Sequence, residues 1–375
     1  MRAHPRLLST ALPLIPSLLL STPAAQEAPE AALQEEMRVL AQDLMAEHRV
    51  PGVAIVLLRA GETAWFEGVG FADRAAGRPI TADTVFNVGS ISKCVAAFGI
   101  LDLVEEGALE LDAPVQDRLE QWRLPASRHD AAGVTLRRIL SHTAGLSVGG
   151  LAGFAPDEEL PSTEQVLAGE TASCGRVRLV HEPGTRWRYS GGGYTVAQLL
   201  VEEVTGEDFA TFMERAVLGP LGLESSAYRW TAELERRAAQ PYGRRGEPIA
   251  GQRFTAVAAA GLQTTPADLA RFASACLSRF PPPGEGDEPI LAPATLERMQ
   301  TPAEAAPKWG LGLNVEHWGG HRVVGHTGAN HGWIGSLWVV PETGDGLVLL
   351  ANGTNADRFF DQLESAWVRF LERDG

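Results

Sequence analysis

Lysine is scarce in this sequence, and no stretch of the chain is strongly basic. Of the 32 basic residues only Lys93 and Lys308 are lysines, and all the others are arginines. The formal net charge is −15, whereas proteins that bind nucleic acids present a basic surface. The composition therefore argues against nucleic acid as a partner. It also singles out the two lysines, because this chain usually uses arginine where only a positive charge is needed.

Cysteine is equally scarce, with three residues in 375. Three cysteines allow at most one internal disulfide and leave one thiol over. Cys94 falls on the apolar side of a predicted helix and is expected to be a small buried side chain. The pairing stays open from sequence, with Cys174 and Cys276 the favoured pair.

No apolar run long enough to cross a membrane follows residue 25. Before it, Arg2 and Arg6 precede a mostly apolar stretch at 7–20 and small residues at 22–25, a pattern typical of a secretory signal. The apolar stretch is about 14 residues long and is interrupted by two prolines, whereas a spanning helix needs about 20. We therefore expect a cleaved signal peptide over 1–25, a periplasmic or extracellular location and no stable membrane insertion. Cleavage of this signal peptide would remove two arginines and no acids, and would take the formal net charge from −15 to −17.

Hydrophobic periodicity predicts strands near both chain ends and helices between them. The expected elements are a helix over 30–47, a hairpin with strands over 53–58 and 63–69, helices over 90–106, 135–141, 194–204, 209–217 and 266–274, strands over 310–315, 322–326, 333–340 and 347–351, and a closing helix over 356–372. The turn-rich segment Pro281 to Gly286 is expected to be a surface insertion.

This order predicts an α/β (α+β) fold, in which an antiparallel sheet built from both chain ends is flanked by helices. A sheet lobe over about 26–90 and 300–375 and a mostly helical lobe over about 91–299 would form a single domain, 26–375. A cleft between the two lobes is where a site is expected.

Ser90 and Lys93 open the helix predicted after Gly89. The i, i+3 spacing places both side chains on one face of that helix. A serine hydroxyl is a weak nucleophile until a base takes its proton, and a neutral lysine can do so whereas arginine cannot. Bringing a lysine pKa from about 10.4 to about 7 takes desolvation or nearby positive charge worth roughly 4 kcal/mol. A solvated lysine on a helix surface is the competing interpretation.

Two further candidates lie downstream. Tyr189 is followed by a glycine-rich turn and could hold or relay a proton, although a buried structural tyrosine would look the same. His326 comes with Thr327 and Gly328 at the end of a predicted strand, where glycine allows a ligand to approach the backbone.

A metal site is the alternative suggested by four histidines that lie close together in the sequence, at His317, His321, His326 and His331. No cysteine partner or helical His-Glu pattern accompanies them. On one strand, His317 and His321 would face one side and His326 the other. No metal is expected.

A rival nucleophile is Ser147, in Gly145-Leu146-Ser147-Val148-Gly149, which matches the elbow of α/β-hydrolases. That elbow requires a strand before the serine and a helix after it. Here helical spacing precedes it and a glycine-rich loop follows, so the context argues against Ser147.

Taken in order, these residues resemble the serine β-lactamase and penicillin-binding-protein superfamily, in the branch of class C β-lactamases, D-alanyl-D-alanine carboxypeptidases, D-aminopeptidases and esterases. Ser90 to Lys93 resembles the Ser-x-x-Lys motif, Tyr189 to Gly191 the Tyr-x-Asn motif, and His326 to Gly328 the Lys-Thr-Gly motif. Supporting stretches are Leu140 to Leu146, Pro220 to Leu223, Ala260 to Leu269 and Trp309 to Gly312.

The resemblance implies a β-lactamase/transpeptidase-like fold and a serine hydrolase that forms an acyl-enzyme on Ser90. Lys93 would activate Ser90, and Tyr189 would act as base or proton relay. The backbone N–H groups of Ser90 and Ala329 would hold the oxyanion, with His326, Thr327 and Gly328 along the substrate. The resemblance implies no cofactor and a small-molecule or peptide substrate. A monomer is favoured.

Two departures from the motifs bear on substrate choice. Gly191 stands where β-lactamases have asparagine, and His326 replaces a permanent positive charge. We therefore rank a peptidase or esterase, acting on a D-amino-acid peptide or a small ester, above a class C-type β-lactamase. A non-catalytic penicillin-binding or sensor module is the alternative of another class. If His326 titrates near 6.5, anionic substrates should gain as the pH falls from about 8 to 6.

Overall fold

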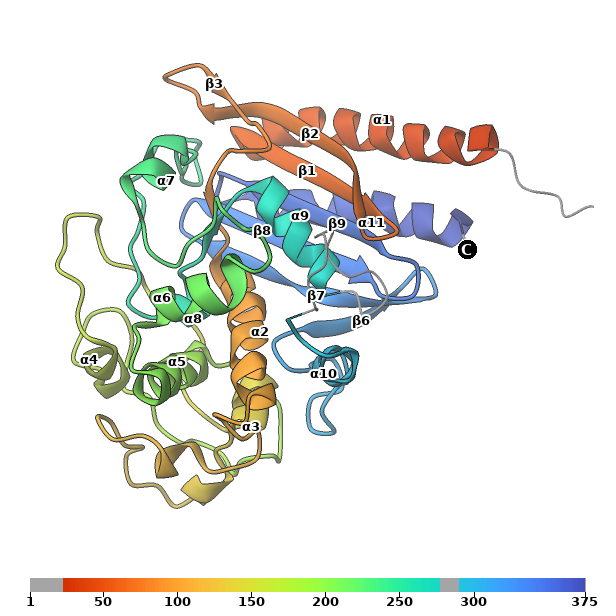
Figure 1. The fold of residues 1–375 in the computed structure, drawn as a ribbon. Helices are drawn as coiled ribbons and strands as arrows, with labels where there is room; N and C mark the ends of the chain where they lie inside the picture. Colours follow the sequence, from red (N-terminus) through yellow and green to blue (C-terminus); the bar gives the residue numbers. More distant parts are fainter. Residues whose placement is uncertain (1–22, 277–289, 375) are drawn as a thin grey trace, which may run out of the picture.

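The computed structural model describes residues 23–276 and 290–374 (Figure 1). Most of the predicted signal peptide and the expected insertion at 281–286 lie outside these described residues. Within them, no helix combines the length and the apolar composition that a membrane crossing requires.

Seven strands form one antiparallel sheet to which the two ends of the chain contribute. Across the sheet their order is β3 (Arg78–Pro79), β2 (Glu62–Asp73), β1 (Gly52–Arg59), β9 (Asp345–Ala351), β8 (Trp333–Val340), β7 (His321–Asn330) and β6 (Asn314–Trp318). The chain ends join where β1 pairs with β9, with Val53 opposite Ala351. The predicted fold class, an antiparallel sheet from both chain ends flanked by helices, is confirmed.

Alternate residues of β1 enter two separate cores, because successive side chains of a strand point to opposite faces. Val53, Ile55 and Leu57 pack beneath α1 (Pro23–His48) and α11 (Ala356–Asp374), which lie side by side (Figure 1). We call this the back face. The neighbouring residues Ala54, Val56 and Leu58 pack on the front face, into the core shared with α2 (Ser92–Glu105) and α9 (Pro266–Ala275).

The middle of the chain forms a helical lobe beside the front face (Figure 1). It includes α3 (Leu136–Leu140), α4 (Thr163–Ala168), α5 (Gly191–Thr205), α6 (Phe209–Met213), α7 (Ala232–Arg237) and α8 (Val257–Ala260). A pair of short strands, β4 (Phe86–Asn87) and β5 (Gln263–Thr264), joins this lobe to the chain just before α2. The periodicity missed α4, α7, α8 and α10 (Pro293–Met299), because four to seven residues are too few to show a helical period.

The strand predicted over 310–315 is largely wrong, since β6 begins at Asn314. The residues before β6 do not form a strand because Gly310 and Gly312 lie in close contact with neighbouring segments. A Cβ on Gly310 would lie 2.0 Å from Met299 O, and Gly312 has a φ of +81°. His317 and His321 also do not share one strand, because the turn at 319–320 separates β6 from β7. In addition, β7 continues to Asn330 instead of ending near residue 326.

All three cysteines are free thiols, so the expected disulfide between Cys174 and Cys276 is not formed. Cys174 follows α4 in a loop, where its Sγ contacts Val166 O at 3.6 Å. Cys276 is buried at the end of α9, a different element. Cys94 is completely buried, in agreement with the prediction that it is a small core side chain.

Candidate active site

Ser90 and Lys93 lie side by side where the front face meets the helical lobe. A single 3-10 turn, Gly89–Ile91, carries Ser90 and leads into α2. One turn later, Lys93 Nζ donates hydrogen bonds to Ser90 Oγ at 3.0 Å and to Ala259 O at 2.6 Å. The structure thus brings these two predicted residues together.

The surroundings of Lys93 change its protonation. Only 2% of Lys93 is exposed. Burial disfavours the charged amine and lowers the pKa of Lys93 from 10.5 to about 7. At neutral pH a large fraction of this amine is therefore neutral, and it can accept the proton of Ser90 Oγ.

Tyr189 lies close to both groups. Lys93 Nζ is 5.0 Å from the centre of the Tyr189 ring. Burial raises the pKa of Tyr189, and a hydrogen bond with the Ser90 side chain opposes this rise only in part. The phenol therefore keeps its proton at neutral pH, which suits a proton relay better than a base.

His326 is buried on the front face of β7, with its ring 6.1 Å from that of Tyr189. Its Nδ1 donates to Thr327 O, which assigns the unprotonated position to Nε2. Nε2 is buried and has no hydrogen-bond partner among the described residues. Burial, and then the charge of Lys93, lower the pKa of His326 to about 3. The expected charging of His326 between pH 8 and 6 is therefore wrong, because burial keeps the ring neutral throughout that range.

The backbone around Ser90 lies directly against β7. A Cβ on Gly89 would lie 2.6 Å from Ala329 N, and a Cβ on Gly328 would lie 2.9 Å from Ser90 N. Glycine at both positions allows this approach, and Gly89 also needs its φ of +52°. The two N–H groups expected at an oxyanion hole are thereby brought to one place.

Gly191 lies at the start of α5. Its N–H donates to Gly149 O at 3.1 Å, and a Cβ there would lie 2.7 Å from Leu151 Cδ1. Leu151 therefore fills the space that a side chain at 191 would need.

A cavity of about 410 Å³ opens at Ser90. Its lining includes Tyr189, His326, Thr327, Gly328 and Ala329 from the predicted set, whereas Lys93 and Gly191 are absent from it. It also includes Trp309, which the sequence marked only as part of the stretch Trp309 to Gly312, and residues that sequence reasoning missed, namely Asn314, Ile334, Gly335, Asp357, Phe360, Asp361 and Glu364.

His142 is a further missed residue, and it holds the chain on both sides of Tyr189. His142 O accepts from Arg188 N at 2.7 Å, and His142 Nδ1 accepts from Ser190 N at 3.1 Å. The rings of His142 and Tyr189 are 4.3 Å apart, and Trp309 lies against both. Only membership of the stretch Leu140 to Leu146 marked His142 in the sequence, because its partners are remote in the chain.

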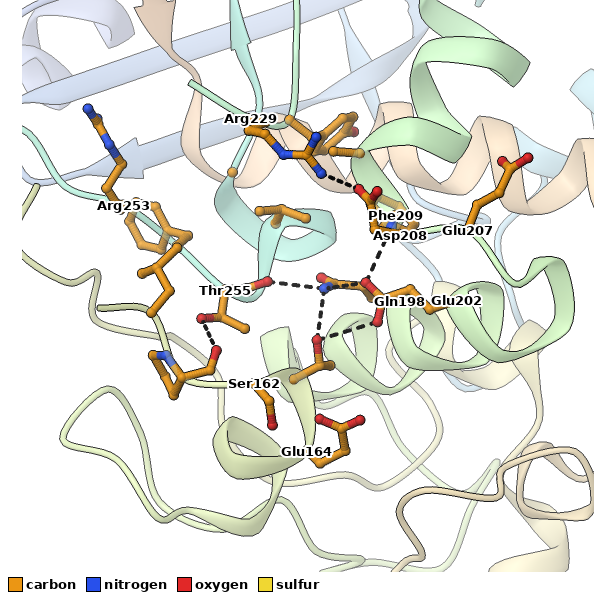
Figure 2. Close-up of a pocket in the computed structure, with 18 of the residues that line it drawn as sticks. Ser162, Glu164, Gln198, Glu202, Glu207, Asp208, Phe209, Arg229, Arg253 and Thr255 are labelled. Atoms are coloured by element: carbon orange, nitrogen blue, oxygen red, sulfur yellow. Dashed lines mark hydrogen bonds and ion pairs between the residues drawn. The ribbon is translucent and has the colours of Figure 1, made fainter. Parts of the chain in front are cut away.

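Gln198 on α5 supports the carbonyl that holds Lys93. Its Oε1 accepts from Ala258 N at 3.1 Å, and its Nε2 donates to Thr255 O at 3.0 Å and to Glu202 Oε1 at 3.1 Å. The bond to Ala258 N holds the start of α8, whose Ala259 O accepts from Lys93, and the bond to Thr255 O holds the chain just before it. Figure 2 shows Gln198 between Thr255 and Glu202 in a larger cavity of about 810 Å³ in the helical lobe.

Ser147, the rival nucleophile, has a structural role. Its Oγ donates to Arg176 O at 3.2 Å and accepts from Arg178 N at 2.9 Å. No strand-turn-helix elbow surrounds it. Across residues 23–276 and 290–374, no group of three or more His, Cys, Asp or Glu side chains could hold a metal ion.

Comparison with known proteins identifies the family of this chain. The family model described as Beta-lactamase matches residues 37–367. The chain belongs to the beta-lactamase family.

Relatives of this beta-lactamase-family protein carry different names. It is 31% identical to penicillin-binding protein 4 of Amycolatopsis lactamdurans over 367 residues, which cover 88% of this chain and 89% of the relative. It is 30% identical to esterase EstB of Burkholderia gladioli over 234 residues, 60% of this chain and 59% of the relative. The octameric penicillin-binding protein homologue from Pyrococcus abyssi superposes with a TM-score of 0.73 at 27% identity, covering 86% of this chain and 74% of that one. These relatives support a serine hydrolase.

Proposed function

We propose that this protein cleaves an amide or ester through an acyl-enzyme formed on Ser90. The observation that carries the proposal is the 3.0 Å hydrogen bond between Lys93 Nζ and Ser90 Oγ, made by a buried lysine whose pKa is about 7. A lysine that served only as a surface charge would be solvated and would keep its ordinary pKa.

In the acylation step, neutral Lys93 accepts the proton of Ser90 as Oγ attacks the substrate carbonyl carbon. The carbonyl oxygen becomes an oxyanion, which the N–H groups of Ser90 and Ala329 stabilise. When the tetrahedral intermediate collapses, the bond to the leaving group breaks. The protonated Lys93 returns its proton to that group through the Tyr189 hydroxyl, which suits a phenol that remains protonated.

Deacylation uses the same groups with water as the nucleophile. Lys93, acting through Tyr189, takes a proton from the water as its oxygen attacks the acyl carbon. The ester bond to Ser90 then breaks, and Oγ regains a proton from Lys93. The products are the free acid and an unchanged enzyme.

The neutral His326 and the space filled by Leu151 favour a peptidase or esterase over a β-lactamase. A β-lactam carries a carboxylate, and His326 offers it no charge because burial keeps the pKa of the ring at about 3. The relative named esterase supports acyl transfer from an ester substrate to Ser90. A D-amino-acid peptide and a small ester are the two substrate classes proposed.

Covalent labelling separates this function from a non-catalytic sensor and from the Ser147 alternative. A fluorophosphonate or fluorescent penicillin should label the wild type and the variant Ser147→Ala, and should fail to label Ser90→Ala. Hydrolysis of p-nitrophenyl acetate should follow the same pattern. Labelling of folded Ser90→Ala, or its loss in folded Ser147→Ala, would contradict the assignment. Labelling without turnover would favour a sensor.

We also propose that the protein is exported, because its N-terminal segment has the composition of a secretory signal. N-terminal sequencing of the mature protein should find a start near Gln26. A monomer remains the prediction for the assembly state, although the homologue from Pyrococcus abyssi is octameric.

A further inference from the structure

The substrate cavity has an acidic far wall that the proposed reaction does not use. Asp357, Asp361 and Glu364 lie on α11 at spacings of four and three residues, and all three line the cavity that opens at Ser90. Such spacing places side chains on one face of a helix. That helix packs on the back face of the sheet, whereas Ser90 lies at the front.

The cavity reaches both faces because the end of β7 is a free edge. Strand β6 pairs with β7 only as far as Gly325, so residues 326–330 have a neighbouring strand on one side alone, β8. Side chains alternate along this strand. His326 and Gly328 face the front and Ser90, whereas Thr327 faces the back, where it lies opposite Ser336 of β8.

The three acids differ in their hydrogen bonds, their exposure and the charges near them. Glu364 accepts hydrogen bonds from Ser336 Oγ at 2.5 Å and from Trp338 Nε1 at 3.2 Å, and burial raises its pKa. Asp361 is exposed, and no ion pair to it is found within the described residues. Asp357 also borders a second cavity, whose lining includes Arg49, Arg244 and Arg358, whereas Asp361 borders the cavity at Ser90 and not this second one. Asp361 therefore presents the most available negative charge.

Within the part of the chain that the structure describes, the cavity offers these acids no permanent positive charge, since Lys93 contacts Ser90 from outside the lining. The described residues that line it include no lysine or arginine. The one basic side chain is His326, whose Nε2 is buried, lacks a partner and is unprotonated. A substrate carboxylate would face three acids here, whereas a substrate cation would face carboxylates and a neutral acceptor.

We propose that this site selects substrates that carry a cationic ammonium group positioned to reach Asp361 across the free edge of β7. The inference rests on the proposed hydrolase function and names the substrate class of that same site. Asp361 acts on specificity and takes no part in bond cleavage.

The test uses ester pairs that differ only in charge. For the acyl part the pair is p-nitrophenyl 4-(trimethylammonio)butyrate and p-nitrophenyl 5,5-dimethylhexanoate. For the leaving group it is acetylthiocholine and 3,3-dimethylbutyl thioacetate. In each pair a quaternary nitrogen replaces a quaternary carbon of similar shape. In at least one pair the wild type should have a kcat/KM about tenfold higher for the cation at low salt, and added salt should reduce this ratio. The responding pair identifies the part of the substrate that carries the cation.

Variants then assign the preference to Asp361. The ratio should fall to about one in Asp361→Asn and should stay at the wild-type value in Glu372→Gln. Glu372 lies on the same helix, is exposed and is absent from the cavity lining, so Glu372→Gln removes one negative charge and leaves the lining residues unchanged. Asp361→Lys should invert the preference in the responding pair.

The two proposals fail in different ways. Equal kcat/KM for both members of both pairs in the wild type, or a ratio that Asp361→Asn leaves unchanged, would overturn the charge preference. Unchanged hydrolysis of every ester by Ser90→Ala would instead overturn the hydrolase assignment. Melting temperatures of all variants show that they are folded.

Discussion

The burial of Lys93 predicts that this residue destabilises the folded protein at neutral pH. Its Nζ is enclosed and hydrogen-bonded only to uncharged oxygens, those of Ser90 and Ala259, among the described residues. In the unfolded chain the pKa is near 10.5, and in the folded protein it is about 7. Between these two values the unfolded chain binds more protons than the folded one. The free energy of unfolding must therefore rise with pH across this window.

The size of the effect follows from the two pKa values. Each pKa unit of difference corresponds to about 1.4 kcal/mol. From pH 7 to pH 9 the folded protein is mostly deprotonated at Lys93 while the unfolded chain is still protonated. Integration over those two units gives about 2 kcal/mol of added stability from this one group. In Lys93→Met, which does not titrate, that increment is absent.

Urea unfolding of the wild type and of Lys93→Met at pH 7, 8 and 9 measures this directly. We expect Lys93→Met to be inactive yet more stable than the wild type at pH 7, with the advantage shrinking by about 2 kcal/mol at pH 9. Lys308→Met is the matched control, because Lys308 is exposed and pairs with Glu316, and its difference from the wild type should not change over this range. A stability difference for Lys93→Met that is the same at pH 7 and pH 9 would refute a buried amine of depressed pKa.

Two further outcomes follow from the site. His142→Leu should lower kcat about tenfold with little change in KM, because it removes the hydrogen bond to Ser190 N that helps to hold Tyr189. His142→Asn keeps an acceptor and should recover part of the rate. Equal rates in the two variants would argue against a role for this hydrogen bond. Nitrocefin should be turned over much more slowly than p-nitrophenyl acetate, and the ratio of their kcat/KM values should stay flat from pH 8 to 6 because burial holds the pKa of His326 at about 3. A nitrocefin gain at pH 6 would show that His326 titrates in that range.

Patterns of apolar residues over a few positions predicted the elements whose formation depends mainly on residues close together in the sequence. The β1–β2 hairpin and the start of α2 follow from alternation and from helical spacing over a few residues. Ser90 and Lys93 meet because an i, i+3 pair is set by the helix itself. The fold class followed in turn from the order of these elements along the chain.

The parts that the sequence did not reveal depend on contacts between distant segments. His142 acts on Tyr189 from 47 positions away in the chain, and Asp361 reaches the cavity only because β6 stops pairing at Gly325. The charge of His326 was also misjudged, because a histidine pKa follows burial and neighbouring charge, and neither is a property of the His326-Thr327-Gly328 motif.

The position of Lys93 shows how the fold holds an amine whose burial is unfavourable. A buried lysine needs acceptors in fixed places, since burial without partners is more expensive still. Ala259 O is one such acceptor, and it belongs to a helix of only four residues, too short to be stable alone. Gln198 holds that helix by its backbone, and Gln198 is in turn anchored on the longer helix α5. The depressed pKa of Lys93 thus depends on α5 and α8 as much as on the two residues of the Ser-x-x-Lys motif.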